Sequence, residues 1–141
     1  MLKSIEEECF LFTYIDRIVI PASVTKIGYA AFVGCRQLKD VEIPKDSKLQ
    51  IIENEAFSCT AIESIFIPSS VIEIGKGAFD KSSLQKVDIP NDSKLQTIGK
   101  YAFRGALIET INIPPTATNI DEEAFVLCKN LKTRIKTTTK S

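Results

Sequence analysis

The stretch IFIPSSVIEIGKGAF, at residues 65–79, decides the fold of this chain. Its first part alternates two isoleucines around one residue and closes with Pro68. This is the pattern of a short strand that ends where the backbone loses a hydrogen-bond donor. In the Val-x-x-Ile step that follows, the two inward side chains are three residues apart. This is a helical or 3₁₀ interval, and the chain is expected to turn there. The Ala-Phe pair then predicts a tight turn in which the ring of Phe79 fills the centre of a coil.

The same pattern recurs along the chain. Its period is set by a phenylalanine that returns in every repeat, namely Phe10, Phe32, Phe57, Phe79, Phe103 and Phe125. Such a regular spacing indicates a solenoid, in which each coil presents the same inward side chains to its neighbour. Alternating apolar pairs, each closed by proline, predict parallel strands around residues 18–20, 41–43, 65–67, 87–89 and 111–113. The closing prolines are expected to line one edge of the resulting sheet.

The expected fold is therefore a right-handed repeat solenoid. It has a parallel β-sheet on one face and short strand, 3₁₀ or one-turn helical segments on the other. Residues 1–133 are predicted to form one solenoid, with about five full repeats plus an N-terminal half repeat. Residues 134–141 are predicted to form a polar C-terminal tail, because Arg134 and Lys136 replace the inward apolar pair. Segments two residues longer between proline and isoleucine occur in every second coil, which indicates a duplicated two-coil module.

Composition narrows the classes of function. The 141 residues include 18 basic and 18 acidic side chains, so no overall electric field attracts nucleic acid or an anionic membrane. Charged residues, serine and proline interrupt every apolar run, and membrane insertion is therefore not expected. The N-terminus lacks the basic and apolar regions of a secretory signal peptide, and the compartment stays unknown.

The residues available for chemistry are few. Histidine is absent, and Cys9, Cys35, Cys59 and Cys128 form no Cys-x-x-Cys pair. We therefore expect the cysteines to pack as small apolar side chains, with no metal site, no cofactor site and no catalytic residue. Acidic runs such as residues 6–8 are interpreted as solvated turns.

The repeat pattern I-x-I-P-x-S-V-x-x-I-G-x-x-A-F-x-x-C-x-x-L resembles the BspA-like class of leucine-rich repeats. IPASVTKIGYAAFVGCRQL (residues 20–38) and IPSSVIEIGKGAF (residues 67–79) match this pattern most closely, and the resemblance covers about residues 2–131. Repeats of this class occur in surface proteins of mucosal protists and bacteria. The resemblance implies a surface-exposed adhesion or host-protein-binding array, and it suggests the cell surface as the location.

The outward positions of the predicted strands form a candidate protein-binding face, because the open sheet of a solenoid is its usual binding surface. The face comprises Asp40, Glu42, Phe66, Lys86, Asp88 and Asn112. An aromatic side chain among acids is typical of an interface hot spot. A single exposed aromatic residue is also common on sheets from β-propensity alone, so the interpretation stays open.

Three functions compete. The first is a non-enzymatic protein-binding or adhesion module in a surface array, with a host or extracellular-matrix protein as one kind of ligand. The second is an intracellular protein-interaction scaffold, favoured by the unpaired cysteines and the missing signal peptide. The third, an enzyme, requires a pocket with convergent polar groups that the sequence does not show.

Overall fold

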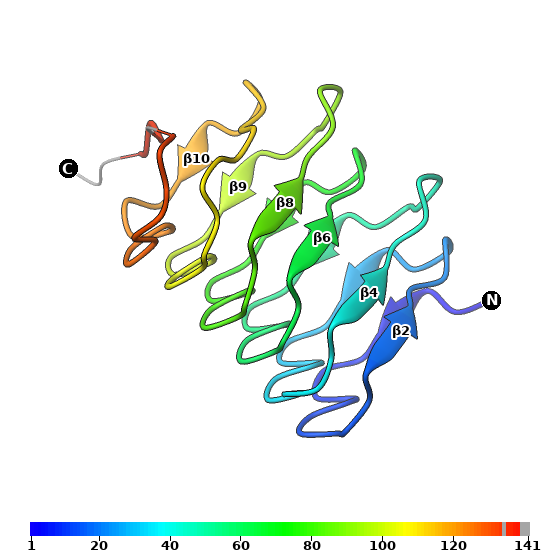
Figure 1. The fold of residues 1–141 in the computed structure, drawn as a ribbon. Coiled ribbons are helices and arrows are strands. Elements are labelled where there is room, and N and C mark those ends of the chain that lie inside the picture. Colours follow the sequence, from blue (N-terminus) through cyan, green and yellow to red (C-terminus); the bar gives the residue numbers. More distant parts are fainter. Residues whose placement is uncertain (134, 139–141) are drawn as a thin grey trace.

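Each repeat of the sequence makes one turn of a coil, and the turns stack side by side (Figure 1). The computed structural model describes residues 1–133 and 135–138. Strands pair in parallel between successive coils, in registers such as Ile27 with Ile52 and Ile52 with Ile74. The expected repeat solenoid is confirmed. Arg134 and residues 139–141, which belong to the predicted tail, lie outside the described residues.

One wall of the coil carries the three-residue strands expected from the alternating pairs. They are β2 (Arg17–Val19), β4 (Asp40–Glu42), β6 (Ser64–Phe66) and β8 (Lys86–Asp88). Each begins one residue earlier than predicted. Within the described residues these strands form two separate parallel pairs, β2 with β4 and β6 with β8, instead of one sheet. The strand expected at residues 111–113 is not formed, and that prediction is wrong.

Coil length varies together with the pairing. Paired strands are connected by the stretches from Arg17 to Asp40 and from Ser64 to Lys86. In each of these stretches, the segment between proline and the following inward isoleucine is of the short kind. The step from Asp40 to Ser64 is longer than either, because it contains a long proline segment. The step from Lys86 to the missing strand contains the second long segment. These longer steps coincide with the junctions at which no ladder joins the strands of this wall in the described chain.

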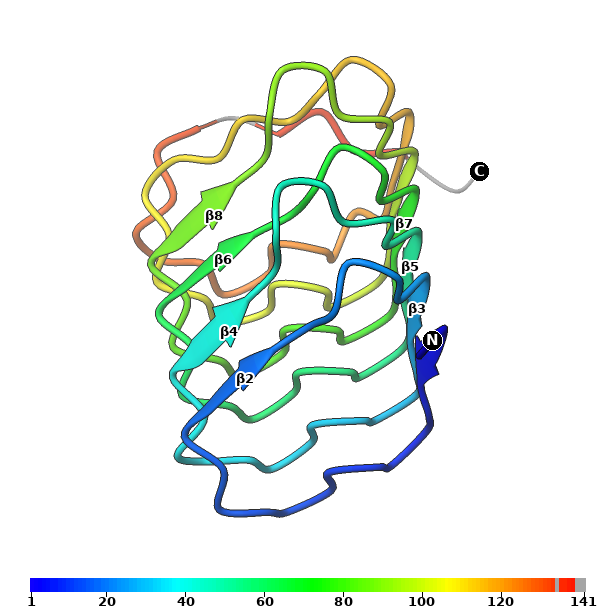
Figure 2. The ribbon, with the colours of Figure 1, turned by 90° about the vertical axis from the view of Figure 1, so that its right-hand side faces the viewer.

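The opposite wall is a continuous parallel sheet that the sequence analysis did not predict (Figure 2). Six strands form it within the described part of the chain, namely β1 (Ser4–Ile5), β3 (Lys26–Ile27), β5 (Ile51–Ile52), β7 (Glu73–Ile74), β9 (Thr97–Ile98) and β10 (Asn119–Ile120). The Val-x-x-Ile step is therefore a turn followed by a two-residue strand. The short strands are confirmed, whereas the helical or 3₁₀ alternative is wrong, since residues 1–133 and 135–138 contain no helix.

Proline begins the turn that joins the two walls. Its carbonyl accepts a hydrogen bond from the N–H three residues later, as Pro68 does from Val71 at 3.0 Å. In the long segments Ser47 is buried, and its hydroxyl accepts a hydrogen bond from the Leu49 N–H. Ser70 of the next coil donates to the carbonyls of Ser47 and Leu49. Serine in the proline turn thus connects a short coil to the long coil before it.

The phenylalanine rings form one stack through the core. Successive ring centroids are 5.0–5.4 Å apart and their planes differ by at most 9°. The four inner rings are completely buried, whereas Phe10 and Phe125 at the two ends are half-buried. Each ring sits in a turn whose residues two before and two after it often adopt positive φ, as Glu55 (φ 60°) and Cys59 (φ 58°) do around Phe57. This turn lets the phenylalanine N–H reach the next coil, as from Phe57 to the Ala78 carbonyl at 2.7 Å.

Candidate protein-binding face

A shallow hollow lies at the junction between β4 and β6, where no ladder joins the two strand pairs of the described chain. Figure 1 shows β2, β4, β6 and β8 side by side along this wall. Polar and apolar side chains of three coils line the hollow, namely Arg17, Lys39, Asp40, Val41, Glu42, Ile43, Ser64, Ile65 and Phe66. The hollow therefore brings three of the predicted site residues together: Asp40, Glu42 and Phe66.

The two acidic residues occupy the positions that the alternation predicted. Asp40 and Glu42 are exposed, and the residue between them, Val41, is buried. Their register partners on β2 are Arg17 and Val19. Arg17 and Lys39 add two exposed cations beside these acids. None of the four charged side chains forms an ion pair with the described residues, so their charges are available to a ligand.

Phe66 is less exposed than the sequence analysis expected. Its side chain is half-buried and packs against the hydrophobic core. It also lines the hollow between β4 and β6. Phe66 therefore offers part of one ring at the base of a charged surface, rather than a fully projecting anchor.

The remaining predicted residues lie farther along the wall. Lys86 and Asp88 are exposed on β8, in register with Ser64 and Phe66. Asn112 is exposed beyond them, but its amide donates to the Ile89 carbonyl at 3.3 Å. It donates also to the side-chain oxygen of Asn91 at 3.1 Å. Asn112 thus connects two coils where the described chain has no backbone ladder.

Lys39 was missed by the sequence analysis, although it lines the hollow. It precedes β4 directly, a position that the alternation assigns to the inward face. Lys39 lies between the preceding turn and the strand, and its N–H donates to the Asp16 carbonyl at 3.0 Å. The side chain is therefore exposed. The alternation could not reveal this, because it holds only within the strand and Lys39 lies just outside β4.

A second charged cluster lies on the phenylalanine turns. Arg104 forms a two-pronged ion pair with Asp80, at 2.9 and 2.7 Å, and lies 4.2 Å from the centre of the Tyr101 ring. Hydrogen bonding to the Asp80 carboxylate raises the pKa of Arg104. Lys100 forms an ion pair with Glu123 at 3.5 Å. These groups are satisfied by one another, so this cluster connects neighbouring coils and is a weaker candidate for binding.

A metal site requires clustered ligands, and a membrane-spanning segment of the helical kind requires a long apolar helix. No group of three or more cysteine, aspartate or glutamate side chains in the described part of the chain is placed to hold a metal ion. Within residues 1–133 and 135–138, no helix has the length and apolar character needed to span a bilayer.

The cysteines differ in exposure, which revises the expectation that all four pack. All four are free thiols. Cys35 is buried and donates to the Phe10 carbonyl at 3.0 Å, and Cys128 donates to the Phe103 carbonyl at the same distance. Burial also raises the pKa of the Cys128 thiol. Cys9 is exposed, because it lies on the first coil and has no neighbour on one side among the described residues.

The reactivity of each thiol should follow the exposure of its cysteine. With a thiol reagent at mildly alkaline pH, we expect Cys9 to react about tenfold or more faster than Cys35 and Cys128, because only an accessible thiolate attacks. Mass spectrometry of the partly labelled protein measures the order, and Cys9→Ser should remove the fast phase. Equal rates for all sites, or a native disulfide, would contradict the structure.

The parallel strands, the phenylalanine stack and the open strand wall define a leucine-rich-repeat solenoid, a class of repeat module that generally mediates protein–protein interaction. The chain belongs to the family of the BspA type leucine rich repeat region, whose sequence model matches residues 3–132 with six copies. The resemblance stated from the repeat pattern is confirmed.

Solved structures show the same fold. The T. pallidum leucine-rich repeat protein superposes with a TM-score of 0.80 and 30% identity, over 92% of this chain and 61% of that one. A leucine-rich cell surface protein from Faecalibacterium prausnitzii superposes with a TM-score of 0.64 and 25% identity, over 94% of this chain and 42% of that one. The pneumococcal vaccine antigen PcpA superposes with a TM-score of 0.67 and 23% identity, over 94% of this chain and 42% of that one. The chain thus spans less than two thirds of the length of each of these structures. No curated protein matches it significantly.

Proposed function

We propose that the hollow between β4 and β6 binds a protein ligand, and that the chain is a non-enzymatic adhesion module of a surface-exposed array. The observation that carries this proposal is the junction itself. It places Asp40, Glu42, Arg17 and Lys39 without ion-pair partners among the described residues around a half-buried Phe66.

The chemistry of this surface suits a protein better than a small molecule. Small ligands are enclosed by concave and mostly apolar pockets, whereas this hollow is shallow and carries both signs of charge. Protein interfaces combine an apolar centre with a polar rim. Phe66 supplies the centre, and Lys86 and Asp88 extend the rim onto the next strand.

The surface location rests on the relatives. One structurally similar protein is described as a cell surface protein and another as a vaccine antigen. A host or extracellular-matrix protein is therefore the ligand that we propose. The four free cysteines favour a second candidate, an intracellular interaction scaffold, because thiols persist in reducing compartments.

Substitutions on the face should weaken binding to an extracellular-matrix protein immobilised on a sensor surface. We expect Phe66→Ala and Asp88→Lys each to weaken binding by about tenfold, which corresponds to ~1.4 kcal/mol. Surface plasmon resonance with a panel of purified matrix proteins measures the effect.

Matched controls lie on the opposite wall. Glu73→Lys makes the same charge change on β7, where Glu73 is exposed, and Ile72→Ala removes an apolar side chain that is 37% exposed there. Both controls should bind as the unmodified chain does. If the face variants bind undiminished while a control variant loses binding, the site lies on the continuous sheet and the assignment to β4 and β6 is wrong.

A further inference from the structure

The outward residues of the strand wall fall into two rows that differ in charge. Each three-residue strand presents its first and third residues outward. The first residues include two cations and one acid, namely Arg17, Asp40, Ser64 and Lys86. The third residues include two acids and no cation, namely Val19, Glu42, Phe66 and Asp88. This second set is called the acid–aromatic row below.

Phe66 lies between the two acids of the acid–aromatic row. Asp88 is its register partner on β8, and Glu42 lines the same hollow from β4. Both acids are exposed, and neither forms an ion pair with the described residues. Because neighbouring strands lie about 4.8 Å apart, two uncompensated carboxylates flank one half-buried ring.

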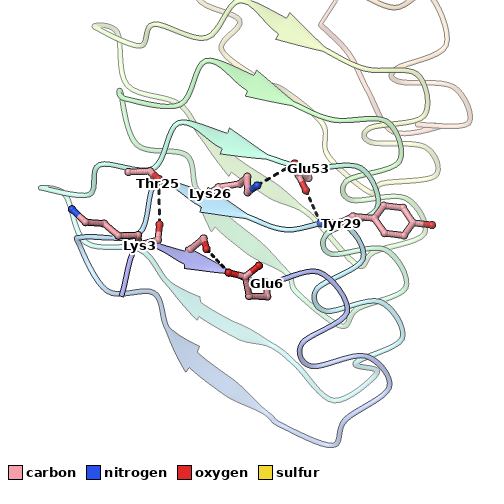
Figure 3. Close-up of polar contacts among 7 residues, drawn as sticks. Lys3, Glu6, Thr25, Lys26, Tyr29 and Glu53 are labelled. Carbon is pink, nitrogen blue, oxygen red and sulfur yellow. Dashed lines mark hydrogen bonds and ion pairs between the residues drawn. The ribbon is translucent and has the colours of Figure 1, made fainter. Parts of the chain in front are cut away.

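A second aromatic side chain among acids lies on the opposite wall, where Tyr29, Glu53 and Glu73 line one hollow. Glu53 is already engaged there. Its carboxylate accepts a hydrogen bond from the Tyr29 N–H at 2.9 Å and pairs with Lys26 at 3.8 Å (Figure 3). Only Glu73 then carries a charge that no cation of the described chain neutralises. The acid–aromatic row is therefore the place where an aromatic ring has an unpaired acid on each side.

We propose that the acid–aromatic row binds an arginine side chain of the protein ligand, with its guanidinium over the Phe66 ring and between the Glu42 and Asp88 carboxylates. The inference rests on the proposed function, because it names the ligand group that the same face recognises. The face of an aromatic ring is electrically negative and attracts a cation. Two flanking carboxylates strengthen that attraction and accept the N–H groups of the guanidinium.

Arginine fits this arrangement better than lysine does. Its guanidinium is planar, so it can stack on a ring while its N–H groups donate sideways to two carboxylates, whereas the ammonium of lysine is compact and strongly hydrated. Val19, which is 54% exposed and in register with Glu42, adds an apolar surface at the end of the row. The cations Arg17 and Lys86 lie about 7 Å away along their strands and favour an acidic or neutral ligand group there.

A pair of short peptides tests the arginine directly. One alternates glycine and arginine, and the other carries citrulline, which has the shape of arginine without its charge. In a nuclear magnetic resonance titration, the arginine peptide should shift the amide signals of Glu42, Phe66 and Asp88. The citrulline peptide should bind at least about fivefold more weakly. Raising the salt concentration tenfold should weaken the arginine peptide as well, since salt screens exposed charges.

Variants of the row identify the groups that bind. Glu42→Gln and Asp88→Asn each remove a charge while keeping the shape, and each should weaken the arginine peptide about threefold to fivefold. Asp40→Asn removes the same charge from the other row and is the matched control, with a change below about twofold. Phe66→Leu keeps an apolar side chain against the core but removes the aromatic face, and it should weaken the peptide about threefold. Thermal unfolding followed by circular dichroism verifies that each variant is folded.

The matrix-protein assay separates this inference from the proposed function. If a matrix protein binds and Phe66→Ala weakens it, while the arginine peptide shifts no signal of the row, the face binds protein without an arginine and the inference is wrong. Equal binding of the arginine and citrulline peptides, or shifts confined to Tyr29 and Glu73, also overturns it. Charge-dependent shifts at the row support the arginine site even if every matrix protein fails to bind, a result that would contradict the proposed ligand alone.

Discussion

Replacing Phe57 by alanine is expected to lower the free energy of unfolding by about 3–5 kcal/mol, the usual cost of removing a buried aromatic side chain. The Phe57 ring is completely buried and stacks on Phe32 and Phe79, at centroid distances of 5.0 and 5.3 Å. Its loss leaves a cavity that interrupts the stack in the middle of the array. Urea denaturation of the variant, followed by circular dichroism, measures the change.

Phe10→Ala is the matched control for this substitution. Phe10 stacks only on Phe32, at 5.1 Å, and its ring is half-buried. We expect a loss of about 1–2 kcal/mol, because an end coil has one neighbour and can open by itself. Equal losses in the two variants would contradict a stack stabilised by nearest neighbours.

Gly75→Ala is expected to have the second largest effect, a destabilisation of about 2–3 kcal/mol from overpacking. A Cβ atom at this position would lie 2.7 Å from the Asn54 backbone nitrogen and 2.8 Å from the Glu53 carbonyl carbon. Both atoms belong to the backbone of the preceding coil, so the two coils must move apart. The side-chain oxygen of Asn54, which accepts a hydrogen bond from the Lys76 N–H, would also be displaced.

Gly105→Ala separates this crowding from backbone strain. Gly105 has a φ of 73°, and an added Cβ would meet no atom within 4 Å. Its substitution should cost only about 1 kcal/mol, the usual penalty of a left-handed conformation for a residue with a side chain. Thermal unfolding of both variants compares the two effects. A larger loss at Gly105 than at Gly75 would show that close approach between coils is not what requires glycine.

The repeat was predictable because each coil must bury the same side chains. Phenylalanine spacing and the isoleucine-proline pairs located β2, β4, β6 and β8 to within one residue, since these positions leave an apolar pattern with period two. Gly75 has no positive φ, which agrees with the presence of Glu53 at the equivalent place of the preceding coil.

Strand pairing could not be predicted in the same way. The segment after Pro44 is two residues longer than its short counterparts, and its path involves hydrogen bonds of Ser47 and Ser70 that the sequence alone does not reveal. The continuous sheet was missed because a strand of two residues has a single inward side chain, such as Ile74, and shows no alternation. The partial burial of Phe66 was missed because the alternation assigns this position to the outward face, although its side chain packs against the core.

The difference between the two walls gives the array a direction of easy bending. The wall of β1, β3, β5, β7, β9 and β10 is joined by a backbone ladder along its length and resists stretching, whereas the ladders of the other wall in the described chain join only β2 with β4 and β6 with β8. A sideways force can widen or narrow the junction between β4 and β6 without breaking a backbone ladder. The solenoid should therefore flex like a hinge at every second coil, and the elastic compliance of the array is concentrated at the hollow beside Phe66.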